Sequence, residues 1–267
     1  MKIYISVDME GIAGVSHRNE VDPEHKEYSV KRELMTLEAV AACEGALKAG
    51  ATEIVVRDAH WDARNIDPAK LPKEARLIRG WSRHPYMMVQ ELDRTFAACA
   101  MVGYHSRAGS GGNPMAHTML GRMFAEMRLN GTPMSEYMLH TMAAGLEDVP
   151  VVFLSGDEEL CREATRFNEG LATVSTSTGR GASMVCLNPS VSRESIRAGV
   201  EKAVGQAKNV QVKKAPAGEL KFEVCFKAAS DAHANSFYPG AKQTSDHVVE
   251  LRTDSYFECL RMLTFMR

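Results

Sequence analysis

A strand–helix–strand pattern occupies the first part of the chain, and no other feature of the sequence constrains the fold as strongly. Residues 3–7 form an apolar run typical of a buried strand. Residues 30–49 carry apolar side chains at helical spacing, Gly50 follows as a helix stop, and residues 52–57 form a second apolar run. Strand, helix and strand in this order predict a βαβ unit with a right-handed crossover, in which the two strands are parallel and adjacent.

Further apolar segments extend this pattern along the chain. We expect strands at 76–80, 97–103, 124–129, 132–134, 149–155, 221–226 and 247–251, and helices at 86–92, 136–144, 158–167, 189–208 and 254–266. Asn130 and Gly131 separate two of these strands, which favours a hairpin with a type I′ turn. The sequence therefore predicts an α/β protein. Its N-terminal half would be a mostly parallel sheet flanked by helices, and its C-terminal half a smaller mixed α/β unit.

Metal-capable side chains follow three of the predicted buried strands. Asp8 and Glu10 come directly after the first strand, His60 follows the second, and His105 follows the strand at 97–103. The carboxyl ends of parallel strands meet at one edge of a sheet, where α/β proteins bind ligands. Alone, each of these residues is more typical of a loop or a helix cap, but three strand ends at one edge favour a shared site. Two imidazoles beside two carboxylates suit Zn²⁺, with Mn²⁺ or Co²⁺ also possible.

A glycine-rich segment, residues 106–114, separates His105 from His117. It lacks both the Lys-Ser/Thr ending of a P-loop and the G-x-G-x-x-G spacing, so a mobile loop is favoured over a phosphate-binding loop. His117 lies in an otherwise apolar stretch, which by itself indicates a buried, hydrogen-bonded histidine. Beside metal ions it becomes a candidate for proton transfer or transition-state stabilisation.

Glu136 lies in the first turn of the helix that is predicted to begin after Ser135, a typical N-cap residue. His140 follows one turn later on the same face. The helix dipole alone would explain a glutamate at this position. Local reasoning therefore leaves a structural and a functional role for Glu136 equally open.

Together, these segments resemble the D-aminopeptidases of peptidase family M55. The matching pieces lie within roughly the first 150 residues and are 6–11, 58–60, 103–105, 115–119 and Glu136 after the Asn-Gly hairpin. The resemblance implies a binuclear zinc site in which Asp8 bridges both ions, with the remaining ligands Glu10, His60, His105 and Glu136. It also implies that His117 is the catalytic residue. The assembly that it implies is a decamer of two stacked pentamers, with active sites facing an internal chamber.

Two positions depart from the family pattern. A well-known member has glycine before the glutamate and asparagine four residues after it, where this chain has Ser135 and His140. These differences leave the metal ligands intact and concern the substrate pocket. A preference for D-configured substrates rests on the resemblance alone.

We expect residues 1–150 to form the metal-binding catalytic half, and residues 151–267 an α+β half that packs against it and contributes to oligomerisation. The expected function is a binuclear zinc aminopeptidase acting on short peptides or amino-acid amides with a free N-terminus. A two-metal phosphoesterase is the alternative, because two metal ions stabilise attacking and leaving oxygens in both reactions. Only Arg107 and Arg122 lie close enough in sequence to hold a phosphate. A second alternative is a catalytically inactive, metal-stabilised binding scaffold.

Composition limits the partners and the compartment. The chain has 32 basic and 34 acidic residues and a net charge of −2, which gives no electrostatic footprint for nucleic acid. No apolar stretch approaches the length of a membrane span, and the first apolar run is too short for a signal peptide. The six cysteines are scattered singly without a C-x-x-C pair, which favours a reducing compartment. We therefore expect a cytoplasmic enzyme with no membrane partner.

Overall fold

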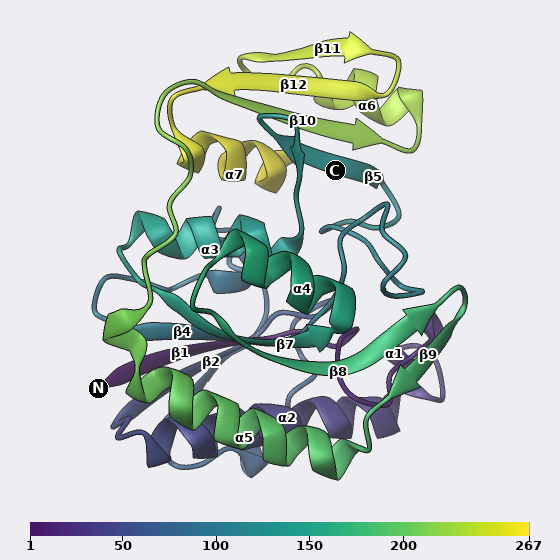
Figure 1. The fold of residues 1–267 in the computed structure, drawn as a ribbon. Helices are drawn as coiled ribbons and strands as arrows, with labels where there is room; N and C mark the ends of the chain where they lie inside the picture. The colour runs from purple at the N-terminus through teal and green to yellow at the C-terminus, as the bar shows by residue number, and fades with distance from the viewer. Residues whose placement is uncertain (267) are drawn as a thin grey trace.

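In the computed structural model, which describes residues 1–266, a seven-stranded sheet forms the centre of the molecule (Figure 1). Its strands, in spatial order, are β3 (Ala75–Ile78), β2 (Glu53–Asp58), β1 (Lys2–Val7), β4 (Ala98–Tyr104), β7 (Val151–Asp157), β8 (Ala172–Arg180) and β9 (Ser183–Cys186). All neighbouring pairs are parallel except β8 and β9. The predicted βαβ unit is confirmed, since β1 and β2 are parallel neighbours.

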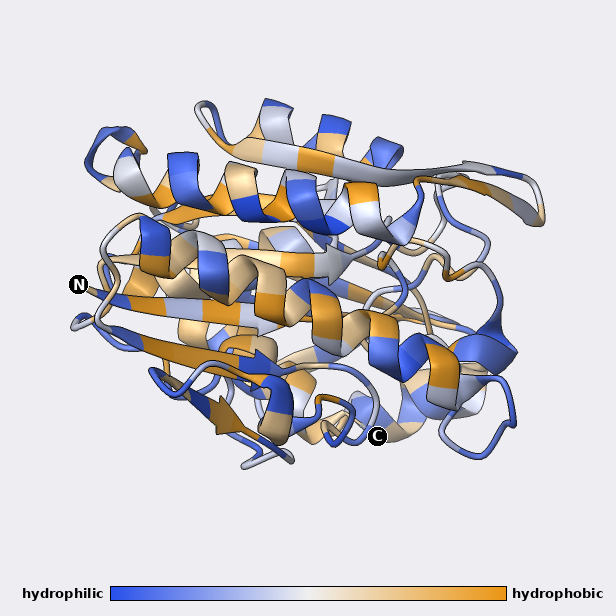
Figure 2. Ribbon diagram, turned by 90° about the horizontal axis from the view of Figure 1, so that it is seen from below, coloured by the Kyte–Doolittle hydropathy of each residue, from blue (hydrophilic) through white to orange (hydrophobic). Residues whose placement is uncertain are grey.

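Helices cover both faces of this sheet (Figure 1). One face carries α2 (Tyr28–Lys48) and α5 (Pro189–Gly205), which pack closely on each other. The core on this side includes Ile3, Ile5 and Val200. The other face carries α3 (Glu136–Leu146) and α4 (Glu158–Phe167). Figure 2 views the molecule from the side of α2 and α5 and shows polar residues interspersed with apolar ones along the helices, as expected for elements with one face against the core.

A second, antiparallel sheet lies beyond α3 (Figure 1). Its strands, in spatial order, are β11 (Ala241–Ser245), β12 (Val248–Thr253), β10 (Leu220–Phe226), β5 (Phe124–Leu129) and β6 (Thr132–Pro133), with helices α6 (Ala229–Asn235) and α7 (Tyr256–Phe265) beside them. Asn130 and Gly131 have φ angles of 50° and 81°, so the β5–β6 turn has the two positive φ angles of a type I′ turn. The expected α/β class with a mostly parallel sheet is confirmed.

Each sheet takes strands from both sides of residue 150. Strands β7 to β9 continue the central sheet, whereas β5 and β6 join the second sheet. The proposed division into 1–150 and 151–267 stays a prediction about folding units. Within residues 1–266, no helix is both long and apolar enough to cross a membrane.

Several short elements differ from the sequence-based expectation. The helix expected at 86–92 is only a 3₁₀ turn, η2 (Met87–Val89), and the helix expected at 189–208 ends at Gly205 before a separate 3₁₀ turn, η3 (Ala207–Asn209). The elements that we did not predict are α1 (Arg18–Val21), η1 (Pro68–Lys70), β8, β9, α6 and β11. Strand β8 is rich in serine and threonine, and it forms because β7 and β9 pair with both of its edges.

Candidate metal centre

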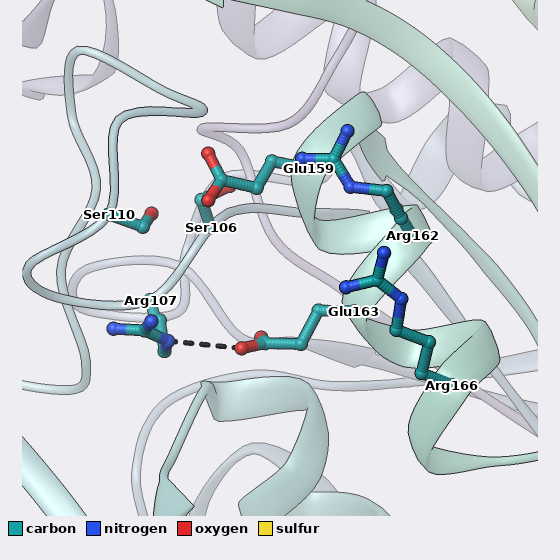
Figure 3. Close-up of a pocket in the computed structure, with 7 residues that line it drawn as sticks. All are labelled: Ser106, Arg107, Ser110, Glu159, Arg162, Glu163 and Arg166. Atoms are coloured by element: carbon teal, nitrogen blue, oxygen red, sulfur yellow. Dashed lines mark hydrogen bonds and ion pairs between the residues drawn. The ribbon is translucent and has the colours of Figure 1, made fainter.

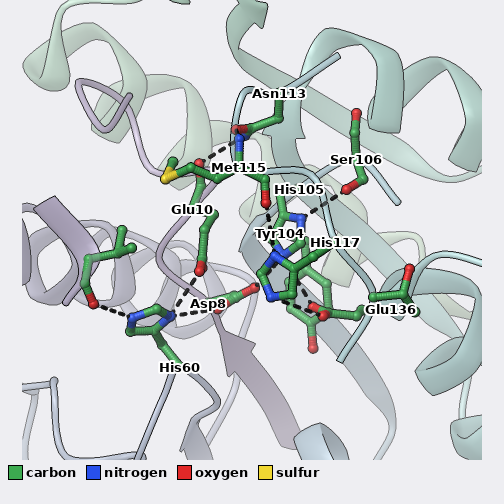
Figure 4. Close-up of polar contacts among 12 residues, drawn as sticks. Asp8, Glu10, His60, Tyr104, His105, Ser106, Asn113, Met115, His117 and Glu136 are labelled. Atoms are coloured by element: carbon green, nitrogen blue, oxygen red, sulfur yellow. Dashed lines mark hydrogen bonds and ion pairs between the residues drawn. The ribbon is translucent and has the colours of Figure 1, made fainter. Parts of the chain in front are cut away.

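Five side chains that were expected to bind metal come together at the carboxyl edge of the central sheet (Figure 4). They are Asp8 and Glu10 after β1, His60 after β2, His105 after β4 and Glu136 in the first turn of α3. All five are buried. The sheet thus brings together residues that are up to 128 positions apart in the sequence.

Two glycines allow the loops after β1 and β4 to approach each other closely. A Cβ atom on Gly11 would lie 1.8 Å from the carbonyl oxygen of Tyr104, and one on Gly103 would lie 2.4 Å from that of Asp8. Gly103 also has a φ of +71°, which favours glycine. The Gly11 N–H donates to the Gly103 carbonyl at 2.8 Å. This contact holds the two loops that carry Asp8 and His105 side by side.

Asp8 lies between two groups of potential ligands. Its Oδ1 is 3.4 Å from Nδ1 of His60, and its Oδ2 is 3.5 Å from Nε2 of His105. Glu10 Oε2 lies 3.0 Å from His60 Nδ1, and Glu136 Oε2 lies 3.4 Å from His105 Nε2. Within each group, the ligand atoms lie within 4.8 Å of one another. The two oxygens of one carboxylate therefore face two separate sets, each with one imidazole and one further carboxylate.

Backbone carbonyls fix which nitrogen of each histidine carries hydrogen. His60 donates from Nε2 to the Val21 carbonyl at 2.8 Å, and His105 donates from Nδ1 to the Ser106 carbonyl at 2.9 Å. In the neutral rings the remaining nitrogen has a lone pair, and that nitrogen faces the carboxylates. His105 Nε2 is buried and has no hydrogen-bond partner among the residues that the structure describes. Lone pairs facing carboxylate oxygens require a cation between them, so this donor set fits a metal ion.

The shifted pKa values of the site residues also indicate that the cluster favours bound positive charge. Burial and the nearby Glu10 carboxylate raise the pKa of Asp8 to about 7. Burial lowers the pKa values of His60 and His105, but the surrounding carboxylates outweigh it and hold both well above the usual range. Protons therefore bind tightly where a metal ion is absent. Divalent cations displace such protons from carboxylate and imidazole ligands.

His117 lies against this centre from the glycine-rich side (Figure 4). Its ring stacks on His105 with a centroid distance of 4.3 Å, and its Nε2 is 3.7 Å from Glu136 Oε1. Nδ1 donates to the Met115 carbonyl at 2.9 Å. The side chain is 25% exposed, in contrast to the five buried residues. His117 also forms a third possible metal group with Glu10 and His105, so position alone permits either proton transfer or metal binding.

Ser135 and His140 occupy structural positions around Glu136. The Ser135 hydroxyl accepts the Met138 N–H, which confirms Ser135 as the N-cap of α3. His140 is fully buried and donates from Nδ1 to the Glu136 carbonyl at 2.7 Å. Burial lowers the pKa of His140 to about 4, so this ring is neutral at physiological pH. His140 belongs to none of the possible metal groups within residues 1–266.

Sequence reasoning missed two residues that support the site. Asp157, at the end of β7, accepts the Ser106 N–H at 2.7 Å and also caps α4. Asn113, in the glycine-rich segment, donates to the Glu10 carbonyl at 3.1 Å. Asp157 follows a buried strand just as Asp8 does, and this signal could have identified it. The contact made by Asn113 joins segments 103 residues apart, so the sequence around Asn113 gives no indication of it.

Comparisons with known proteins identify the family to which the chain belongs. The model of peptidase family M55, D-aminopeptidase, matches residues 1–265. A D-aminopeptidase of Bacillus subtilis (strain 168) is 38% identical over 191 residues, which are 71% of this chain and 68% of that protein. The solved structure of the Zn-dependent D-aminopeptidase DppA from Bacillus subtilis, described as a self-compartmentalizing protease, superimposes with a TM-score of 0.93 and 29% identity. The match covers 100% of this chain and 96% of that one.

Proposed function

Since the chain belongs to peptidase family M55, the D-aminopeptidases, we propose that it is a zinc-dependent aminopeptidase whose buried carboxylate–histidine cluster is the active site. Its relative from Bacillus subtilis shares the fold over the whole chain and depends on zinc. Neither the phosphoesterase nor the inactive scaffold is favoured by these relatives. Arg107, one of the two arginines considered for holding a phosphate, forms an ion pair with Glu163 at 3.0 Å, and this ion pair involves none of the proposed metal ligands.

The observation that carries this proposal is the position of Asp8 between two ligand groups. We propose two zinc ions per subunit: one held by Asp8, Glu10 and His60, and the other by Asp8, His105 and Glu136. Mn²⁺ or Co²⁺ would suit the same donors. Bound zinc supplies Lewis-acid polarisation of a carbonyl group and lowers the pKa of water towards neutrality.

His117 is the proposed proton carrier. It is the most exposed of the six site residues, and its Nε2 faces the ligand cluster while Nδ1 is held by the Met115 carbonyl. A ring held in this way can accept a proton at Nε2 and pass it to the leaving amine of a peptide. His140 cannot take this role without rearrangement, because its ring is fully buried behind the Glu136 backbone.

We propose short peptides or amino-acid amides with a free N-terminus as substrates, with D-residues at the scissile bond. The handedness comes from the family and not from any contact in the structure. A decamer enclosing its active sites would agree with the self-compartmentalizing relative. The cytoplasmic location stays a prediction.

A panel of substrates tests this function. Aminoacyl-p-nitroanilides of both configurations and p-nitrophenyl phosphate are assayed with and without a chelator. We expect hydrolysis of the D-anilides, loss of activity with chelator, and recovery with zinc. Hydrolysis of the phosphate ester alone would support the phosphoesterase, and inactivity of the zinc-loaded protein on every substrate would support the binding scaffold.

A further inference from the structure

A polar pocket lies between α4 and the segment that follows β4 (Figure 3). Its volume is about 160 Å³. The residues that line it carry hydroxyl, guanidinium or carboxylate groups, and they are Ser106, Arg107, Ser110, Glu159, Arg162, Glu163 and Arg166. None of them is one of the proposed metal ligands or His117.

Positive charge and free hydrogen-bond donors are in excess in this pocket. Three guanidinium groups face two carboxylates, and one of these carboxylates, Glu163, is paired with Arg107 at 3.0 Å. Within residues 1–266, Arg162 and Arg166 form no ion pair. The Ser110 hydroxyl oxygen is buried and also lacks a partner in this part of the chain. Arg162 and Arg166 lie one helical turn apart on α4, so both side chains reach the same space (Figure 3).

We propose that this pocket binds a small oxyanion, either a carboxylate or a phosphate-like group, between Arg162, Arg166 and Ser110. Guanidinium groups match the geometry of both anions and form two parallel hydrogen bonds with them. The volume lies well below the roughly 300–1,000 Å³ of pockets for drug-sized ligands, which limits the ligand to a small group. Glu159 also lines the pocket, on the side of Gly112, where a Cβ atom would lie 2.5 Å from its Oε2.

The pocket shares two chain segments with the metal centre. The Ser106 carbonyl accepts the Nδ1 hydrogen of His105 at 2.9 Å. On the other side, Glu163 contacts both Arg107 and the Ser135 hydroxyl, and Ser135 directly precedes Glu136. An anion bound beside Arg107 would compete with Glu163 for that guanidinium. The oxyanion site is therefore separate from the metal site but built on the segments that position His105 and Glu136.

Calorimetric titration of the zinc-loaded protein with sodium sulfate tests the proposal, with sodium acetate as a parallel carboxylate titration. Ionic strength is kept constant with sodium chloride, because screening alone changes weak anion binding. The test variant is the double substitution Arg162→Gln and Arg166→Gln. Arg180→Gln is the matched control, because Arg180 is an exposed arginine outside the pocket.

We expect saturable binding of at least one anion, an affinity loss of about tenfold or more in the double variant, and no change in the control. The stronger of the two titrations identifies the preferred anion. Non-saturable heats, or equal affinity in the wild-type protein and the double variant, would overturn the proposal. A double variant that changes only the oligomeric state would also overturn it and assign the two arginines to a subunit contact. Aminopeptidase activity, measured separately, reports on the proposed function and not on this pocket.

Discussion

Three histidines at the site each donate one ring N–H to a backbone carbonyl. The acceptors are Val21 for His60, Ser106 for His105 and Met115 for His117. This bond directs the other ring nitrogen towards carboxylate oxygens, so each ring is held ready to bind a cation or a proton. The five proposed metal ligands are buried, whereas the His117 side chain is partly exposed to solvent. This difference distinguishes the proposed ligands from the proposed proton carrier.

Replacing His117 with alanine tests this separation. We expect His117→Ala to keep its zinc and to lose about 100-fold or more in kcat, because a positioned general acid or base contributes on that scale. Zinc content by elemental analysis and turnover of a D-aminoacyl anilide are measured on the same sample. His233→Ala, at an exposed position on α6, is the control. Loss of zinc would make His117 a ligand, and near-wild-type turnover would remove it from catalysis.

Glu38 on α2 provides a test of stability against pH. It is buried, and its carboxylate accepts the Ala13 N–H at 3.1 Å and the Ser192 hydroxyl at 2.8 Å. Burial raises the pKa of Glu38 from 4.5 to about 7. Because the raised pKa belongs to the folded state, the stability that the protonated form contributes is full below pH 4.5. It is lost as the pH rises through about 7.

Glu38→Gln keeps a neutral side chain and an acceptor oxygen at every pH. We expect the variant to be more stable than the wild type at about pH 8, by roughly 1–3 kcal/mol, and to lose this advantage towards about pH 5. Thermal unfolding at several pH values measures the effect. Glu201→Gln, at an exposed position on α5, is the control. A stability difference that does not depend on pH would contradict the account of Glu38.

Among the structural elements, the paired loops after β1 and β4 determine the geometry of the site. Gly11→Ala would place a Cβ 1.8 Å from the Tyr104 carbonyl oxygen and force the loops apart. We expect a loss of about 1–3 kcal/mol or more in stability, together with reduced zinc content. Gly111→Ala is the matched control, because nothing lies within 4 Å of its Cβ position. Unchanged zinc content and stability in Gly11→Ala would show that this close approach is not required.

The sequence predicted the elements that depend on apolar burial and missed those that depend on their neighbours. Strands β1, β2 and β4 are continuous apolar runs, and the polar residues at their ends follow from parallel pairing at one edge. Strand β8 consists largely of serine and threonine between two pairing partners, so its own residues give little signal. The apolar run Met87–Val89 fits an α-helix as well as a 3₁₀ turn, so its residues alone do not distinguish the two.

The candidate site was predictable in its residues but not in its fine geometry. Asp8, Glu10, His60 and His105 follow from strand ends, whereas Glu136 and His117 needed the family resemblance to distinguish them from a helix-terminal carboxylate and a core histidine. The direction of each imidazole depends on backbone carbonyls elsewhere in the fold, such as Val21 for His60. Contacts of this kind have no periodicity that a sequence could show.

For the whole molecule, we predict a decamer in solution. The solved relative is described as self-compartmentalizing, and its fold covers this entire chain. Sedimentation velocity at several protein concentrations should show a single species with the mass of ten subunits. A single species of another mass, such as a monomer, would contradict the decamer.

Anomalous diffraction from zinc-loaded crystals tests the proposed pair of zinc ions bridged by Asp8 most directly. Data collected above and below the zinc absorption edge locate zinc independently of any other ion. We predict two peaks in each subunit, about 3.5–4 Å apart, with the Asp8 carboxylate between them. One peak lies beside Glu10 and His60 and the other beside His105 and Glu136. A single peak, or two peaks that do not share Asp8, would contradict the bridged site.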